Sequence, residues 1–177
     1  MSRRARLLVT MYGLSVSVYA VDRLTKAWAE RSLQGHAPIE LIPKVLDLSY
    51  TTNSGGAFSL FAGVPWVFFA ASVGISAAIV WHSRRLTRTS TAVGLGLVVG
   101  GAIGNLTDRL VRASGFANGT VVDFIHLHLW PTFNVADSCI VIGAGVLVLS
   151  GVLAGDAEEP DRSAGAPGPE DASTPGR

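Results

Sequence analysis

The sequence predicts an all-α membrane protein, a bundle of four transmembrane helices with a small extracytoplasmic β element in the first outer loop. Hydrophobic residues make up 49% of the 177 residues and charged residues only 15%, and the mean hydropathy is +0.40. This balance is typical of a small integral membrane protein. Four apolar segments, at about 7–28, 61–82, 91–110 and 134–153, each approach the ~20 residues that a helix needs to cross the hydrocarbon layer.

The first segment follows Arg3, Arg4 and Arg6 and could be mistaken for a signal peptide. Its apolar run is long and continues into the polar stretch 22–26 without a small-residue cleavage site. We therefore expect a retained membrane span.

The first outer loop, residues 29–60, carries alternating apolar residues over 38–52. This pattern predicts a short strand or hairpin on the membrane surface, whose edge could pair with an extended peptide. The loop closes with Asn53, Ser54, Gly55 and Gly56. Adjacent glycines favour a turn, and Gly55 would also let a bound chain approach the backbone closely.

Basic residues in the short loops predict the orientation. Three arginines precede the first span, and Arg84, Arg85 and Arg88 lie between the second and third. The positive-inside rule places both groups, and both termini, in the cytoplasm.

Residues 1–154 are expected to form one membrane domain. Residues 155–177, rich in Pro, Gly, Ala and acidic residues, are expected to form a disordered cytoplasmic tail.

The acidic residues separate into three groups. Six lie in the tail, and Glu30, Glu40 and Asp47 lie in the first outer loop, where we interpret them as solvated. The other four are brought to the outer membrane face by spans of alternating direction: Asp22, Asp108, Asp123 and Asp137. Charged groups at such positions are costly and indicate a functional site.

Asp123, expected in the loop before the last span, and Asp137, one turn into that span, are the candidate catalytic pair. Two carboxylates that approach each other can perform acid–base hydrolysis with water. Close carboxylates cannot both ionise cheaply, so the pair should share one proton. The sequence does not indicate which aspartate holds it.

The third span ends in a polar cluster after glycines 100, 101 and 104, which predict close helix packing. Asn105 and Arg109 are four residues apart and share a helix face. They could hold a carboxylate or a substrate carbonyl. Alternatively, Arg109 forms an ion pair with Asp108 or Asp22.

Other chemistries find little support. The single Cys139 excludes an internal disulfide and a CxxC motif. His126 and His128, beside Trp130, are interpreted as membrane-interface residues rather than metal ligands. No metal, cofactor or nucleic-acid partner is expected, and no nucleotide-binding loop is present.

Five motifs occur in an order that resembles the lipoprotein signal peptidases (signal peptidase II), the aspartyl intramembrane proteases of bacteria. They cover about 7–153 and are Asp22-Arg23-Leu24-Thr25-Lys26, Asn53-Ser54-Gly55-Gly56-Ala57-Phe58, Gly104-Asn105-Leu106-Thr107-Asp108-Arg109, Val121-Val122-Asp123-Phe124 and Phe133-Asn134-Val135-Ala136-Asp137. Each motif alone is weak evidence, whereas their order is specific.

The resemblance implies an endopeptidase that cuts diacylglyceryl-modified prolipoproteins immediately before the lipidated lipobox cysteine. It places the catalytic pair on Asp123 and Asp137. The implied support residues are Asp22, Lys26, Asn53, Asn105, Arg109 and Asn134. The enzyme would act as a monomer among the lipids of the bacterial cytoplasmic membrane, with its site toward the extracytoplasmic face.

The chain departs from the family pattern in two places. The connection 110–122 is longer than usual and should lie over the site, and Gly56 stands where alanine is common.

Two other classes of protein are weighed against the peptidase. A transporter or channel would carry polar residues along a path at mid-depth, and an assembly factor would use the polar cluster only for helix packing.

Overall fold

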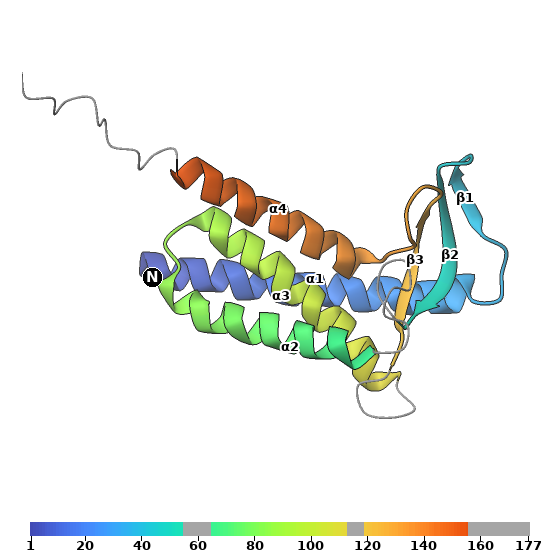
Figure 1. The fold of residues 1–177 in the computed structure, drawn as a ribbon, viewed down its shortest axis with the longest axis horizontal. Coiled ribbons are helices and arrows are strands. Elements are labelled where there is room, and N and C mark those ends of the chain that lie inside the picture. Colours follow the sequence, from blue (N-terminus) through green and yellow to red (C-terminus); the bar gives the residue numbers. More distant parts are fainter. Residues whose placement is uncertain (55–64, 113–118, 156–177) are drawn as a thin grey trace, which may run out of the picture.

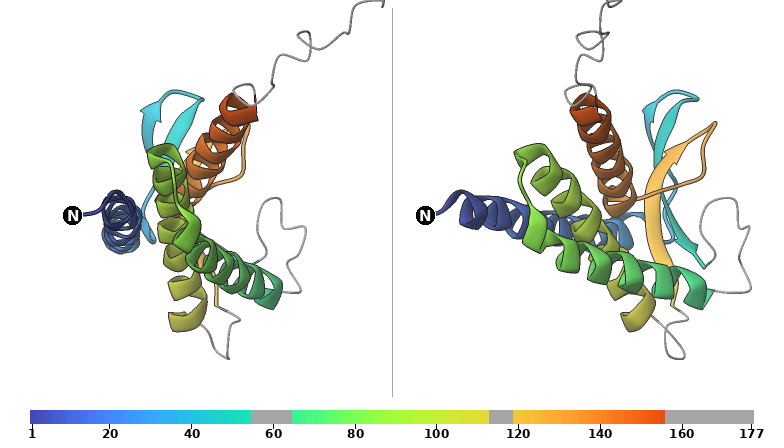
Figure 2. Two further views of the ribbon diagram at one scale, coloured as in Figure 1. Left: turned by 90° about the vertical axis from the view of Figure 1, so that its left-hand side faces the viewer. Right: turned by 60° about the vertical axis from the view of Figure 1, so that its left-hand side comes forward.

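The computed structural model describes residues 1–54, 65–112 and 119–155. Four long helices lie alongside one another, and a small sheet lies at one end of them (Figure 1). The helices are α1 (Arg3–Leu33), α2 (Pro65–His82), α3 (Thr89–Val111) and α4 (Val135–Gly155), with a short 3-10 helix, η2 (Ser83–Arg85), between α2 and α3. The central helix is α3, which packs against the other three, as the two rotated views show (Figure 2).

Within the described ranges, three helices are long and apolar enough to cross a membrane: Arg3–Leu33, Thr89–Val111 and Val135–Val152. Helix α2 forms over most of the second predicted span and has 18 residues. Its role as a fourth span stays a prediction. The domain boundary after residue 154 also stays a prediction, since 156–177 lie outside the described residues.

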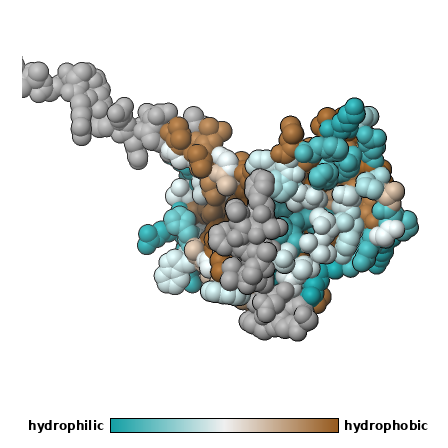
Figure 3. Space-filling model, turned by 45° about the vertical axis from the view of Figure 1, so that its right-hand side comes forward, coloured by the Kyte–Doolittle hydropathy of each residue, from teal (hydrophilic) through white to brown (hydrophobic). Residues whose placement is uncertain are grey.

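The surfaces of the helices fit a lipid environment. Large apolar side chains of α1 and α4 are exposed, including Val16, Leu24, Val141 and Val148. Such surface would be unfavourable in water. The space-filling view shows hydrophobic surface over α4 toward the chain terminus, and hydrophilic surface gathered at the end that carries the sheet (Figure 3).

The first helix is longer than the predicted span 7–28. It begins after Ser2, whose hydroxyl accepts a hydrogen bond from the Ala5 N–H at 3.2 Å, and it continues for 31 residues to Leu33. The expectation that the outer loop begins at residue 29 is therefore wrong. Ala29 and Leu33 remain helical because they are buried against Val122 and Phe124 of the sheet.

The sheet has the order β1-β2-β3, with β1 (Ile39–Ile42), β2 (Leu46–Asn53) and β3 (Val121–Leu127) antiparallel to their neighbours. The predicted hairpin over 38–52 is confirmed as β1 and β2. Since β2 pairs on both sides and β1 only with β2, the edge that could pair with a peptide would be that of β1, and this role stays a prediction.

The third strand was not predicted. Asp123 lies in β3 opposite Thr51 of β2, rather than in a loop. The run 121–125 is too short to separate strand from loop, and its pairing partner lies about 70 residues earlier in the chain. The strand places Asp123 more rigidly than a loop would.

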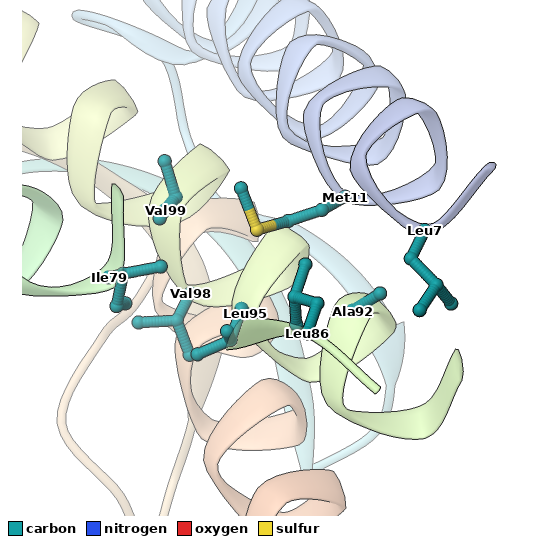
Figure 4. Close-up of a cluster of buried hydrophobic side chains, with 8 residues drawn as sticks. All are labelled: Leu7, Met11, Ile79, Leu86, Ala92, Leu95, Val98 and Val99. Carbon is teal, nitrogen blue, oxygen red and sulfur yellow. The ribbon is translucent and has the colours of Figure 1, made fainter. Parts of the chain in front are cut away.

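The apolar core lies toward the end of the bundle that carries the N-terminus. Leu7 and Met11 of α1 meet Ile79 of α2, Leu86 and one face of α3 (Figure 4). The contact between α1 and α3 is close because Gly100 leaves room for it. A Cβ atom at Gly100 would lie 2.7 Å from the Ser15 carbonyl oxygen.

We therefore expect Gly100→Ala to lower the free energy of unfolding by about 1–3 kcal/mol, the usual cost of overpacking. SDS-induced unfolding in mixed micelles measures this change. The control is Gly13→Ala on α1, where an added Cβ meets nothing within 4 Å. This variant should be neutral or slightly stabilising. Equal stability of the two variants would contradict the proposed role of Gly100.

Candidate active site

The two aspartates singled out in the sequence meet between β3 and the first turn of α4. Asp123 lies in the middle of β3 and is 2% exposed, and Asp137 lies in the first turn of α4. Asn134, which is fully buried, joins them. Its Nδ2 donates to Asp123 Oδ1 at 2.6 Å, and its backbone N–H donates to Asp137 Oδ2 at 3.2 Å. One residue thus holds both carboxyl groups.

Asn134 also caps α4. Its Oδ1 accepts a hydrogen bond from the Asp137 N–H at 3.0 Å. The two residues therefore bond each other reciprocally, in the manner of a capping box. The positive end of the helix dipole favours negative charge on Asp137. The position of Asp137 follows from the way α4 begins.

Two further asparagines complete the contacts of the pair. Asn53, at the end of β2, donates from Nδ2 to Asp123 Oδ2 at 3.1 Å. Asn105 of α3 donates from Nδ2 to Asp137 Oδ1 at 2.7 Å. All four carboxyl oxygens of the pair therefore accept an N–H donor. Both asparagines were predicted as support residues.

The environment of Asp123 disfavours its ionised form. Burial raises the pKa of Asp123 to about 7, and the nearby negative charge of Asp137 adds to this effect. Hydrogen bonds from Asn53 and Asn134 and the charge of Lys26 act in the opposite direction. A pKa of about 7 allows Asp123 to hold a proton near neutral pH.

A buried ammonium group supports Asn105. The side chain of Lys26 on α1 is 0% exposed, and its Nζ lies 2.9 Å from both Asp22 Oδ2 and Asp108 Oδ2. Nζ also donates to Asn105 Oδ1 at 2.8 Å. The ammonium thus forms two ion pairs and one hydrogen bond. Because Asn105 Oδ1 faces Lys26, its Nδ2 is directed at Asp137.

Asp22 connects α1 with α4. Its Oδ1 accepts a hydrogen bond from the Ala136 N–H at 3.1 Å, one of the free donors at the start of α4. Gly104 of α3 leaves room for this carboxylate, since a Cβ atom at Gly104 would lie 2.5 Å from Asp22 Oδ2. The predicted close packing of the glycines in α3 is thus part of the polar site.

Asp108 has a wider role than the sequence indicated. It forms a close ion pair with Arg23 and accepts from Arg112 Nε at 3.2 Å. Arg112 also binds both carboxylate oxygens of Glu30, at 2.8 and 3.0 Å. The interpretation of Glu30 as a solvated loop residue is wrong, because α1 continues through it. The spacing of Asp108 and Arg112 was a usable signal, whereas no sequence pattern links Arg112 to Glu30.

A cavity of about 420 Å³ opens onto the pair. Arg109, which is 4% exposed, lines it and donates from Nη1 to the Gly119 carbonyl at 3.3 Å. The cation that lies between Asp22 and Asp108 is Lys26. The polar end of the cavity comprises Asn53, Asn105, Arg109, Asp123 and Asp137, and its apolar walls include Ile75, Val98, Ile140 and Val141.

The structure thus brings together eight of the predicted site residues. Asp123, Asp137, Asn53, Asn105 and Asn134 form direct hydrogen bonds, Lys26 and Asp22 support them, and Arg109 lines the same cavity. The ninth, Gly55, lies outside the described residues, as does 113–118 of the long connection before β3.

Comparisons with known proteins agree with this geometry. The family model of signal peptidase (SPase) II matches residues 14–153. The lipoprotein signal peptidase of Mycobacterium avium (strain 104) is 41% identical over 154 residues, 87% of this chain and 83% of the relative. That of Rhodococcus jostii (strain RHA1) is 43% identical over 147 residues, 83% of this chain and 73% of the relative.

A solved structure described as a bacterial membrane enzyme has a TM-score of 0.69 and 26% identity, and the match covers 84% of this chain and 90% of that one. A second such structure has a TM-score of 0.66 and 28% identity, with 77% and 88% covered. The family model spans most of the chain and the relatives exceed 40% identity, so this chain belongs to the signal peptidase II family of membrane proteases.

Proposed function

We propose that this chain is a membrane-embedded aspartic endopeptidase that removes the signal peptide from prolipoproteins. The observation that carries the proposal is the buried pair of Asp123 and Asp137, held by Asn134 and open to a cavity with apolar walls. The relatives are named lipoprotein signal peptidases, which supports the same substrate class.

The two carboxyl groups take different roles in the proposed reaction. Ionised Asp137 accepts a proton from water as the water oxygen attacks the scissile carbonyl carbon. Protonated Asp123 donates its proton to the carbonyl oxygen, which gives a neutral gem-diol intermediate. When the C–N bond breaks, Asp123 recovers a proton from the intermediate and Asp137 donates one to the leaving amine. Both carboxyl groups thereby return to their starting states.

The lining of the cavity favours a substrate that is polar at the cleavage point and apolar around it. An extended peptide would lie with its scissile bond at the polar end and its hydrophobic flank, or a lipid chain, against the walls from α2, α3 and α4. This arrangement suits a diacylglyceryl-modified prolipoprotein cut just before the lipidated cysteine. In this proposal Arg109, which lines the cavity, holds a backbone carbonyl of such a chain.

The proposed topology has four spans, with α2 as the second. The polar site and the sheet then lie toward the extracytoplasmic face of the bacterial cytoplasmic membrane, and both termini lie in the cytoplasm. The arginines at the start of α1 and those between α2 and α3 support this orientation. We propose that the chain acts as a monomer, since one chain supplies both aspartates.

Asp123→Asn and Asp137→Asn should each reduce cleavage of a diacylglyceryl prolipoprotein by at least about 10³-fold, because a missing acid or base cannot be replaced by water. The rate of cleavage by each purified variant is measured from the shift of the product on a gel. The control is Asp47→Asn on β2, which removes a carboxylate away from the pair and should retain activity. Normal cleavage by either Asp123→Asn or Asp137→Asn would exclude the proposed pair.

The value of kcat/KM should fall as the pH rises through about 7, because Asp123 must be protonated to donate and its pKa lies at about 7. The hydrogen bond from Asn53 stabilises the ionised form of Asp123. Asn53→Leu should therefore move this limb of the profile to higher pH. A pH profile of each enzyme tests the assignment, and an unchanged limb in the variant would contradict it.

Lys26→Met should lower the free energy of unfolding by about 3–5 kcal/mol, since it leaves Asp22 and Asp108 buried without their shared cation. The control is Arg31→Met, which removes a positive charge from an exposed position on the same helix and should change stability by no more than about 0.5 kcal/mol. SDS-induced unfolding distinguishes the two, and equal stabilities would refute a supporting role for Lys26.

A further inference from the structure

A second group of ionisable side chains lies on the sheet, apart from the paired aspartates. Asp47 of β2 is the direct partner of His126 in β3, and His128 follows two residues later, just past the end of β3. The interpretation of Asp47 as a solvated loop residue is wrong. Its Oδ2 lies 2.8 Å from His128 Nε2, and its side chain is only 17% exposed.

These three residues share one face of the sheet. Alternate residues of a strand point to opposite faces, and directly paired residues point to the same face. His126 and His128 therefore lie on the face opposite to that of Asp123, and Asp47 joins them across the strands. The two imidazole rings are close, with centroids 5.2 Å apart.

The donor atoms are close enough to bind one ion. One ring nitrogen from each histidine and one oxygen of Asp47 lie within 4.8 Å of one another. In a tetrahedral zinc site with bonds of about 2.0–2.1 Å, the ligand atoms are about 3.3 Å apart. Side-chain movements of about 1–2 Å would bring the ligand atoms to this spacing. His128 has room to move because its side chain is 40% exposed.

Two further features favour a bound cation. Among the described residues, Asp47 Oδ1 is buried and accepts no hydrogen bond, so a carboxylate oxygen remains to be satisfied. His126 Nδ1 lies 3.1 Å from Thr132 Oγ1. This contact orients the ring in the way that outer partners orient metal-binding histidines, and it leaves Nε2 available as a ligand.

We propose that Asp47, His126 and His128 form a binding site for a zinc ion on the face of the sheet opposite to the paired aspartates. Two imidazoles and a carboxylate suit zinc better than calcium or magnesium, which prefer oxygen ligands alone. Three protein ligands leave the fourth position to water. The ion would join β2 to β3 and take no part in peptide cleavage.

The test uses the full-length enzyme in detergent, with the affinity tag removed and prior metal stripped by a chelator. Calorimetric titration with Zn²⁺ should give one ion per chain. His126→Ala, His128→Ala and Asp47→Asn should each weaken binding by at least about tenfold, as loss of a ligand requires. Co²⁺ should give the visible absorption of a tetrahedral site in the wild type and lose it in the variants.

The matched control is His36→Ala, which removes an exposed histidine outside the sheet and should bind Zn²⁺ as the wild type does. Prolipoprotein cleavage by all four variants, and by the metal-stripped enzyme, should be unchanged, which also shows that they are folded. Absence of one-to-one binding would overturn the site. Binding by His126→Ala and by His128→Ala that is as tight as that of the wild type would also overturn it. Loss of cleavage when the metal is stripped would contradict the proposal that the ion takes no part in cleavage.

Discussion

The contact between the Lys26 ammonium and the carboxylates of Asp22 and Asp108 is the interaction on which the polar site depends. Three charges in the interior of a helix bundle are stable only when each is paired and hydrogen-bonded. Their pairing draws α1 and α3 together, and Asp22 extends the contact to the start of α4. The arrangement therefore fixes three helices at the level of the paired aspartates.

The same network has a chemical effect beyond packing. An asparagine side chain can present either its oxygen or its nitrogen to a neighbour, and Lys26 selects the orientation of Asn105. Asn134 is oriented in turn by its place at the beginning of α4. The surroundings of the two carboxyl groups are thus set by groups that the fold already requires, and no flexible loop is needed to bring the donors into place.

The sequence predicted much of this site because its local signals were strong. Apolar length indicated the helices, and the spacing of Asn105 and Arg109 indicated one polar helix face. The strand of Asp123 and the pair of Arg112 with Glu30 were not predictable in the same way. Each depends on partners about 70 to 80 residues away in the chain, and local periodicity contains no information about such contacts. Asp47 was misjudged for the same reason, since its partners lie on β3.

The length of α1 has a consequence for where a substrate can be cut. At 31 residues, the helix is about 46 Å long and exceeds the ~30 Å of hydrocarbon. Its last turn, through Ala29 and Leu33, is buried against Val122 and Phe124, the neighbours of Asp123. The helix therefore fixes the distance between the N-terminal end of the bundle and the strand that carries Asp123. In the proposed orientation, the length of this helix therefore sets how far Asp123 lies from the cytoplasmic side of the membrane.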